Sequence, residues 1–376
     1  MKLAVPKETA SGETRVAATP ESVKKFKSLG LDVVVEAGAG AAAHIADADY
    51  VAMGASIAPD ARSALADADI VLKVRGPASA ESGLIKRGAV VVALLAPHSE
   101  KAAISTLASQ GAVAFAMEFL PRISRAQAMD VLSSQANLAG YKAVIDAAAQ
   151  FGRAMPMMMT AAGTIAPARV LVMGVGVAGL QAIATAKRLG AIVSATDVRP
   201  ATKEQVESLG GTFVAVMDEE FKNAQTAGGY AKEMSAEYQA KQAALTAETI
   251  KKQDIVITTA LIPGRKAPIL VTEDMIKTMK PGSVIVDLAA EAGGNTPLTK
   301  AGEVVEVHGV TIMGYTNLPG RLAVDSSSLY ARNLFNFVSL LVDKKTGALA
   351  IDWNDEIVKG ALVAKDGELV HPAVKS

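Results

Sequence analysis

The sequence predicts an α/β protein made of two doubly wound lobes, each built on a mostly parallel sheet. The chain has 376 residues, which is long for one hydrophobic core, so two domains of ordinary size are expected. Its Val/Ile/Leu runs are continuous rather than alternating, as in strands buried on both faces of a parallel sheet. Residues 254–257 also repeat the pattern of 69–72, and 275–286 repeat that of 84–92. The repetition favours two similar lobes.

The first lobe is predicted to alternate strands with helices, beginning with a strand at residues 2–5. Thr19 is suited to the N-cap of the first helix because Pro20 then occupies its first position, and Gly30 ends that helix. The later strands are expected at 32–36, 69–74, 89–95 and 112–118.

The second series begins near Arg169, with strand 169–173, helix 177–189, strand 192–197 and helix 200–209. A long helix through 138–148 is expected to join the lobes, and a helix at 325–342 to return to the first. We therefore predict Rossmann-like lobes at 1–137 with 325–376, and at 138–324. The methionines at 155 and 157–159 are expected to pack at the junction.

Composition excludes several classes of protein. Lys plus Arg equals Asp plus Glu at 38 each, so no net charge favours nucleic acid or an anionic membrane. The absence of cysteine excludes disulfides and thiol chemistry. The four histidines lack metal-ligand spacing, so no metal site is expected. We see no signal peptide and no spanning segment, and expect no direct insertion into a membrane.

The strongest motif is the glycine run Gly174-Val175-Gly176-Val177-Ala178-Gly179. It follows an apolar strand and opens a helix, which is the context that a dinucleotide fingerprint requires. Gly174 would permit the tight turn, Gly176 the approach of backbone amides to a pyrophosphate, and Gly179 close helix–strand packing. The alternative is a glycine-rich turn without a ligand.

Asp197 ends the next predicted strand, eighteen residues after Gly179. A carboxylate there accepts hydrogen bonds from ribose hydroxyls and repels a 2′-phosphate, so NAD(H) is favoured over NADP(H). Arg199 is close enough in sequence to weaken that preference.

A polar segment at 121–135 follows the strand that ends at 118. It offers Arg122, Gln127, Asp130 and Ser133, whose directional hydrogen bonds suit a carboxamide and a ribose. Taken alone, it could be a solvated helix start. With the fingerprint, it predicts the nicotinamide end of a site in the cleft between the lobes. A further stretch, 218–252, is predicted to form a lid in which Tyr230 covers the nucleotide; the alternative is an exposed loop.

The residues also carry a family resemblance. The opening, 1–8 with 13–16, resembles that of alanine dehydrogenases and transhydrogenase alpha subunits. Five further runs resemble the transhydrogenase subunits specifically: 121–141, 157–179, 226–234, 258–264 and 291–295.

This resemblance implies an NAD(P)+ transhydrogenase alpha subunit of the proton-translocating, Re/Si-specific type. Hydride would pass directly between NAD(H) on this chain and NADP(H) on a partner component, coupled to proton translocation by a membrane-spanning component. It also implies a homodimer that is cytoplasmic and peripheral on the inner membrane through its partners. Arg122, Gln127 and Asp130 would be the catalytic group. The implied contacts to the nucleotide are Arg122, Gln127, Asp130, Ser133, Gly174, Val175, Gly176, Gly179, Asp197, Val198, Arg199, Gly229, Tyr230, Gln242 and Leu261.

Two other functions stay open at this point. Alanine dehydrogenase is the nearest, because Arg15 and Lys73 match positions that bind the keto acid there. However, Leu94 stands where that enzyme has its catalytic histidine, and Glu291 where it has an aspartate. Loss of the histidine removes the proton-transfer group that oxidative deamination needs. The chain could also be an NAD-responsive binding module without turnover.

Overall fold

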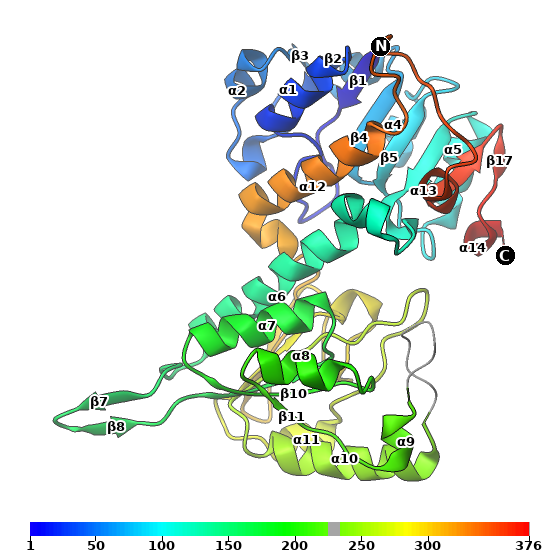
Figure 1. Cartoon of the computed structure of the whole chain (residues 1–376). Helices are drawn as coiled ribbons and strands as arrows, with labels where there is room; N and C mark the ends of the chain where they lie inside the picture. The colour runs from blue at the N-terminus through cyan, green and yellow to red at the C-terminus, as the bar shows by residue number, and fades with distance from the viewer. Residues whose placement is uncertain (225–233, 376) are drawn as a thin grey trace. The chain divides into compact units, whose positions relative to one another are not determined.

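The structure is a computed structural model that describes residues 1–224 and 234–375. The chain divides into two compact units, each treated separately below: unit 1 is Met1–Gln135 with Pro319–Ser376, and unit 2 is Ala136–Leu318. Each unit contains one large, mostly parallel sheet (Figure 1). The predicted α/β class is therefore confirmed. None of the described helices combines the length and apolar character that a membrane span requires.

Unit 1 has, within the described residues, an eight-stranded sheet in the order β17-β16-β6-β5-β4-β1-β2-β3. The strands from β3 to β6 are parallel, and β16 pairs antiparallel with β6. The bounds are β1 Lys2–Val5, β2 Asp32–Glu36, β3 Ser56–Ala58, β4 Ile70–Arg75, β5 Val90–Leu94, β6 Val113–Ala116, β16 Leu362–Lys365 and β17 Glu368–Leu369.

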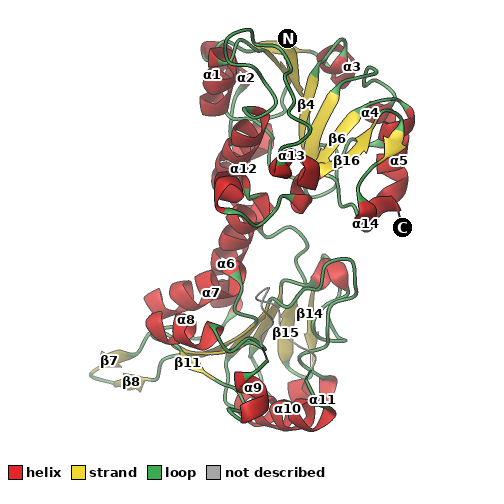
Figure 2. Ribbon diagram, turned by 45° about the vertical axis from the view of Figure 1, so that its right-hand side comes forward, coloured by secondary structure: helices red, strands yellow, loops and turns green. Residues whose placement is uncertain are grey.

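Helices cover both faces of this sheet (Figure 2). On one face, Leu3 and Val5 pack with Phe26 of α1 and Leu334 of α12. On the other face, Ala4 and its neighbours pack with α5. The alternation of strand side chains between two apolar layers explains the continuous hydrophobic runs. The helices are α1 Pro20–Ser28, α2 Asp47–Ala52, α3 Ala61–Leu65, α4 Ser79–Ser82, α5 Lys101–Ser109, α12 Ala323–Val338, α13 Glu356–Ala361 and α14 Pro372–Lys375.

Unit 2 has, among its described residues, a seven-stranded sheet in the order β11-β10-β9-β12-β13-β15-β14, in which β14 is antiparallel. The strands are β9 Arg169–Met173, β10 Ile192–Thr196, β11 Thr212–Phe213, β12 Ile255–Thr258, β13 Val284–Asp287, β14 Val304–Val307 and β15 Val310–Met313. The helices are α7 Val177–Arg188, α8 Thr202–Ser208, α9 Glu219–Lys222, α10 Ala236–Ile250 and α11 Glu273–Lys277, with the later turns of α6 Val131–Gln150.

The repeated sequence phrases form the same hydrogen-bonded clamp in each unit. In unit 1, the Asp69 carboxylate accepts from Lys2 N at 2.8 Å and from Lys86 Nζ at 2.6 Å. In unit 2, the Asp254 carboxylate accepts from Arg169 N at 2.8 Å and from Lys280 Nζ at 2.9 Å. Each aspartate thus joins the start of the first strand of its sheet to a turn that precedes a later strand.

The lysine of the second clamp is not the one that the sequence comparison suggested. The phrase beginning at Met275 pairs Lys277 with Lys86 by type, but Lys277 lies in α11 and contacts Asp274. Lys280 occupies the equivalent place because it precedes Gly282 by two residues, as Lys86 precedes Gly88. Both glycines have positive φ, +80° and +81°, which fixes this turn.

Other sequence-based expectations are corrected in detail. The strand expected to reach residue 118 ends at Ala116, and a short 3-10 turn, η2 (Met117–Phe119), follows. The predicted lid stretch is largely helical, since α9 and the 15-residue α10 lie within it. Met155 is buried, but Met157, Met158 and Met159 are exposed at a hairpin formed by β7 (Met158–Thr160) and β8 (Gly163–Ile165). This hairpin projects from the body of unit 2 (Figure 1), so these three methionines do not pack in a core.

Candidate nucleotide-binding site

The glycine turn of unit 2 lies at the point where the strand order reverses. β9 is paired with β10 on one side and β12 on the other, and the chain leaves β9 in one direction and returns to β12 from the other. Ligands of open α/β sheets bind at the carboxyl ends of the strands at such a point. Here the turn after β9 meets the end of β12, since Thr259 Oγ1 donates to Gly174 O at 3.0 Å.

The three glycines of the turn meet three different requirements. Gly174 has φ +101°, and a Cβ on it would approach Thr259 Oγ1 to 2.4 Å. A Cβ on Gly179 would lie 1.9 Å from Gly174 O, so α7 can start against β9 only with glycine there. Gly176, the N-cap of α7, has no such neighbour, because its Cβ position faces open space. Two glycines therefore allow the fold, and the third leaves the helix N-terminus accessible to an anion.

Asp197 directly follows β10, and its carboxylate lies against this turn. It accepts from Val175 N at 2.7 Å and from Arg199 N at 2.9 Å. The Arg199 side chain adds Nε and Nη2, each at 2.9 Å, and Nη2 also donates to Val175 O at 3.1 Å. This ion pair raises the pKa of Arg199.

Side chains on the neighbouring segments border this carboxyl edge. Val198 and Leu261, both predicted contacts, are exposed apolar side chains, as is Ile262, which sequence reasoning did not single out. Gln242 of α10 donates from Nε2 to Thr196 Oγ1 at 3.3 Å and accepts from Val216 N at 2.9 Å. It therefore ties α10 to the end of β10 beside Asp197.

Asn295 is a supporting residue that the sequence reasoning did not assign a role. It is fully buried, and its side chain bonds Ala260 O, Ala260 N and Pro268 O at 2.8–3.1 Å. The loop after β12, which carries Leu261, is thereby fixed to the rest of unit 2. A buried asparagine after paired glycines was the available signal, but its partners are 27–35 residues away in sequence.

In unit 1, the predicted nicotinamide segment forms the 3-10 helix η3 (Ser124–Met129) and the first turn of α6. Asp130 caps α6: its carboxylate accepts from Ser133 N at 2.9 Å and from Ser133 Oγ at 2.5 Å. The pair therefore lies together, at the turn where η3 passes into α6. Arg122 and Gln127 are exposed side chains on the same segment.

This segment is anchored by α12 and α13. Asn333 and Asn336 of α12 both donate to Ala128 O at 2.9 Å. Arg125 forms a two-pronged ion pair with Asp355, the N-cap of α13, at 2.7 and 2.9 Å. The backbone on either side of Gln127 is thus fixed by residues more than 200 positions later in the chain.

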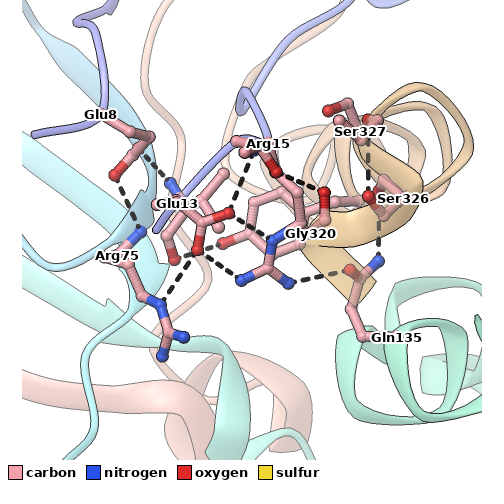
Figure 3. A network of polar contacts seen from close by, with 12 residues as sticks. Glu8, Glu13, Arg15, Arg75, Gln135, Gly320, Ser326 and Ser327 are labelled. Carbon is pink, nitrogen blue, oxygen red and sulfur yellow. Dashed lines mark hydrogen bonds and ion pairs between the residues drawn. The ribbon is translucent and has the colours of Figure 1, made fainter. Parts of the chain in front are cut away.

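The corresponding carboxyl edge of unit 1 contains a buried charge network instead of glycines (Figure 3). Glu13 accepts from Arg15 Nε and Nη2 at 2.7 and 2.6 Å and from Arg75 Nε at 3.1 Å. Arg15 Nη1 donates to Gln135, whose amide in turn donates to Ser326 O. Burial raises the pKa of Glu13, but the hydrogen bonds and charge of Arg15 more than offset it, and the pKa is lowered. The network joins the two sequence segments of unit 1.

Lys73 and Glu8 extend this network. Lys73, 1% exposed, is 2.8 Å from Glu81 and 3.8 Å from Glu8. Glu8 also accepts from Val74 N and Arg75 N at 2.7 and 3.3 Å. Burial raises the pKa of Glu8 to about 7, although the Lys73 charge acts against it. A pocket of about 180 Å³ lies beside Glu8, Glu13 and Arg15.

The structure therefore brings the predicted residues into two groups. One group in unit 2 surrounds the glycine turn: Gly174, Val175, Gly176, Gly179, Asp197, Val198, Arg199, Gln242 and Leu261. The other, in unit 1, lies on one segment: Arg122, Gln127, Asp130 and Ser133. Gly229 and Tyr230 lie outside the described residues. Among those described, no three His, Asp or Glu side chains are grouped so as to hold a metal ion.

Comparison with known proteins matches this architecture to one family. The model "Alanine dehydrogenase/PNT, N-terminal domain" matches residues 4–139, and "Alanine dehydrogenase/PNT, C-terminal domain" matches 143–372. The fold and the glycine-turn site thus define a member of the alanine dehydrogenase/PNT family, to which the chain belongs.

Within the family, the chain resembles transhydrogenase alpha subunits more than alanine dehydrogenases. It is 58% identical to the first of the polypeptides that form the NAD(P) transhydrogenase alpha subunit of Rhodospirillum rubrum, over 100% of this chain and 99% of the relative. The crystal structure of transhydrogenase from Sinorhizobium meliloti superposes with a TM-score of 0.90 at 55% identity, covering 98% of this chain and 100% of that one. Alanine dehydrogenase of Halomonas elongata is 31% identical over 100% and 96%. The predicted family is confirmed.

Proposed function

We propose that the chain is the NAD(H)-binding subunit of a proton-translocating transhydrogenase. The observation that carries the proposal is the open Cβ position of Gly176 at the start of α7, next to the Asp197 carboxylate. Unpaired N–H groups at a helix N-terminus favour a pyrophosphate, and a neighbouring carboxylate favours an unphosphorylated ribose. The residues present therefore fit NAD(H).

The two groups of residues would hold opposite ends of one nucleotide. The glycine turn would hold the pyrophosphate and Asp197 the adenosine ribose. Gln127 and Arg122 would orient the nicotinamide carboxamide, and the Asp130–Ser133 pair its ribose. Gly229 and Tyr230 would contribute contacts from the segment outside the described residues.

When bound, NADH supplies a hydride from its nicotinamide ring. The chain needs no general acid or base for such a transfer, since it has to hold one ring against another and exclude water. The rigid anchoring of η3 by Asn333, Asn336 and Arg125 suits this positioning role.

The acceptor and the proton path would belong to other chains. We propose an NADP(H)-binding component and a membrane-spanning component as partners, with a dimer of this subunit attached to the membrane through them. The R. rubrum relative is named as one portion of an alpha subunit, which supports a multi-subunit assembly. The exposed methionines of the β7–β8 hairpin offer an apolar surface to a second copy.

The alternative, alanine dehydrogenase, is less well supported. Leu94 is the last residue of β5, and Glu291 lies in the 3-10 turn η4 (Ala290–Ala292). Leu94 cannot transfer a proton, and Arg15 and Lys73 are already paired with carboxylates. We expect no alanine-dependent reduction of NAD+ by the purified chain; turnover at a rate typical of dehydrogenases would favour this alternative.

The main test is reconstitution. The chain is titrated with NADH and NADPH and then mixed with an NADP(H)-binding component, and reduction of an NAD analogue by NADPH is followed. We expect tighter binding of NADH and hydride transfer in the mixture. Binding without transfer would leave only an NAD-responsive module, and no binding of NADH would refute the proposal.

Two variants assign the roles within this test. Asp197→Ser should weaken NADH binding and narrow its advantage over NADPH. Gln127→Asn should slow transfer more than it weakens binding, because it disturbs ring apposition. A loss confined to affinity would contradict that role for Gln127.

A further inference from the structure

The carboxylate of Asp197 has no free acceptor position in this structure. A carboxylate has about four lone-pair sites, and four N–H donors lie within 2.7–2.9 Å of its two oxygens. Two donors are backbone groups, of Val175 and Arg199. The other two belong to the Arg199 guanidinium.

The position of this guanidinium coincides with the contact assigned to the nucleotide. A ribose diol offers two O–H donors, which is the number that Arg199 supplies through Nε and Nη2. Nη2 also donates to Val175 O within the glycine turn, at 3.1 Å. The side chain therefore spans the space between the end of β10 and the turn after β9.

We propose that Arg199 is an internal substitute for the ribose diol and a determinant of nucleotide selectivity. The ribose hydroxyls of an incoming nucleotide displace its Nε and Nη2 from Asp197, while the two backbone donors remain. The displaced guanidinium stays beside the 2′ position. This inference rests on the proposed NAD(H) function and defines how that site discriminates.

The charge of Arg199 acts on the two nucleotides in opposite directions. For NADH, the ion pair must be broken before Asp197 can accept from the ribose, which weakens binding. For NADPH, the guanidinium both compensates the repelling carboxylate and can pair with the 2′-phosphate. Arg199 therefore reduces the preference for NADH that Asp197 alone would give.

Arg199→Met tests this directly, since methionine keeps much of the side-chain length but has no donor or charge. We expect the ratio of NADPH to NADH dissociation constants to widen about tenfold, the size expected for one charge-assisted hydrogen bond. NADH should bind more tightly and NADPH less tightly. Arg199→Lys retains the charge without the two-pronged geometry and should leave the ratio close to that of the wild type.

Arg188→Met is the matched control, because it removes the same charge from the exposed last turn of α7, at the other end of that helix from the glycine turn. It should change neither constant. A ratio that narrows or stays within about twofold in Arg199→Met would overturn the inference. Wild-type protein that binds neither nucleotide would instead refute the proposed function, so the two failures are distinct.

Discussion

Gly176 and Gly179 stand three residues apart in one turn of helix, yet the structure assigns them opposite tolerances. A methyl group on Gly179 would meet the carbonyl of Gly174, whereas one on Gly176 would meet nothing within 4 Å. Gly176 also has a φ of −83°, which alanine adopts without strain. The same substitution at the two positions should therefore separate folding from binding.

Gly179→Ala should lower the free energy of unfolding by about 3 kcal/mol, because α7 must move away from β9. Gly176→Ala should leave stability nearly unchanged but weaken NADH binding by about tenfold or more, since its methyl group occupies the approach to the helix N-terminus. Chemical denaturation and fluorescence titration measure the two effects. Equal losses of stability in both variants would contradict the assignment.

Glu8 makes unit 1 sensitive to pH. Its folded-state pKa, about 7, lies above the ordinary value of 4.5 because of burial. The folded chain therefore holds this proton more tightly than the unfolded chain does. The resulting stabilisation is complete below pH 4.5 and is lost as pH rises through 7.

Relative to Glu8→Gln, the wild type should lose up to about 3 kcal/mol of unfolding free energy between about pH 4.5 and about pH 7. Glutamine has a similar shape but does not ionise, so the variant subtracts the contributions of other groups. Urea denaturation at several pH values gives the difference. A difference that is constant with pH would show that Glu8 does not titrate in this range.

At the scale of elements, the two aspartate clamps share geometry but differ in burial. The side chain of Asp254 is 5% exposed and that of Asp69 is 28% exposed. A buried hydrogen bond to a charged group contributes more than an exposed one because its partners lose access to water. The clamp of unit 2 should therefore stabilise its sheet more.

We expect Asp254→Ala to destabilise the chain by about 2 kcal/mol and Asp69→Ala by about 1 kcal/mol or less. Both variants free a backbone N–H and a lysine at the same place in the fold, so each is the control for the other. Thermal unfolding followed by circular dichroism measures the order. The reverse order would mean that exposure does not govern the strength of the clamp.

Sequence patterns predicted strands and glycine turns well, because these depend on local residues. Thr19 and Pro20 were correctly placed at the start of α1, and strand β9 has the predicted bounds. The helix α10 was missed, although Ser235 is an N-cap before an alanine-rich run, because the length of the segment favoured a loop. The anchoring of η3 by Asn333 and Asp355 could not be predicted, since a contact across 200 residues leaves no local pattern.

At the scale of the whole molecule, the units differ in how the chain builds them. Unit 2 is one continuous segment, whereas unit 1 combines both ends of the chain. The lobe boundaries predicted from the sequence, 137/138 and 324/325, remain a proposal about independent folding. The Arg15–Gln135–Ser326 connection shows why unit 1 needs both of its segments.

A fragment of residues 130–318, which keeps the Asp130 cap of α6, should fold and unfold cooperatively because unit 2 has its own apolar core on both faces of its sheet. It should bind NADH more weakly than the full chain, since it lacks Arg122 and Gln127. Circular dichroism and titration test both points. A fragment without a cooperative transition would contradict the first, and undiminished affinity the second.

The repeated clamp also has a practical consequence for measuring the energetics of this fold. Asp69 and Asp254 are chemically identical groups that perform the same task in two sheets of one polypeptide, at one protein concentration and in one buffer. Differences between the two sites therefore report only their surroundings, free of the variation between separate samples. The chain thus contains its own internal standard for how burial changes the strength of an ionic hydrogen bond.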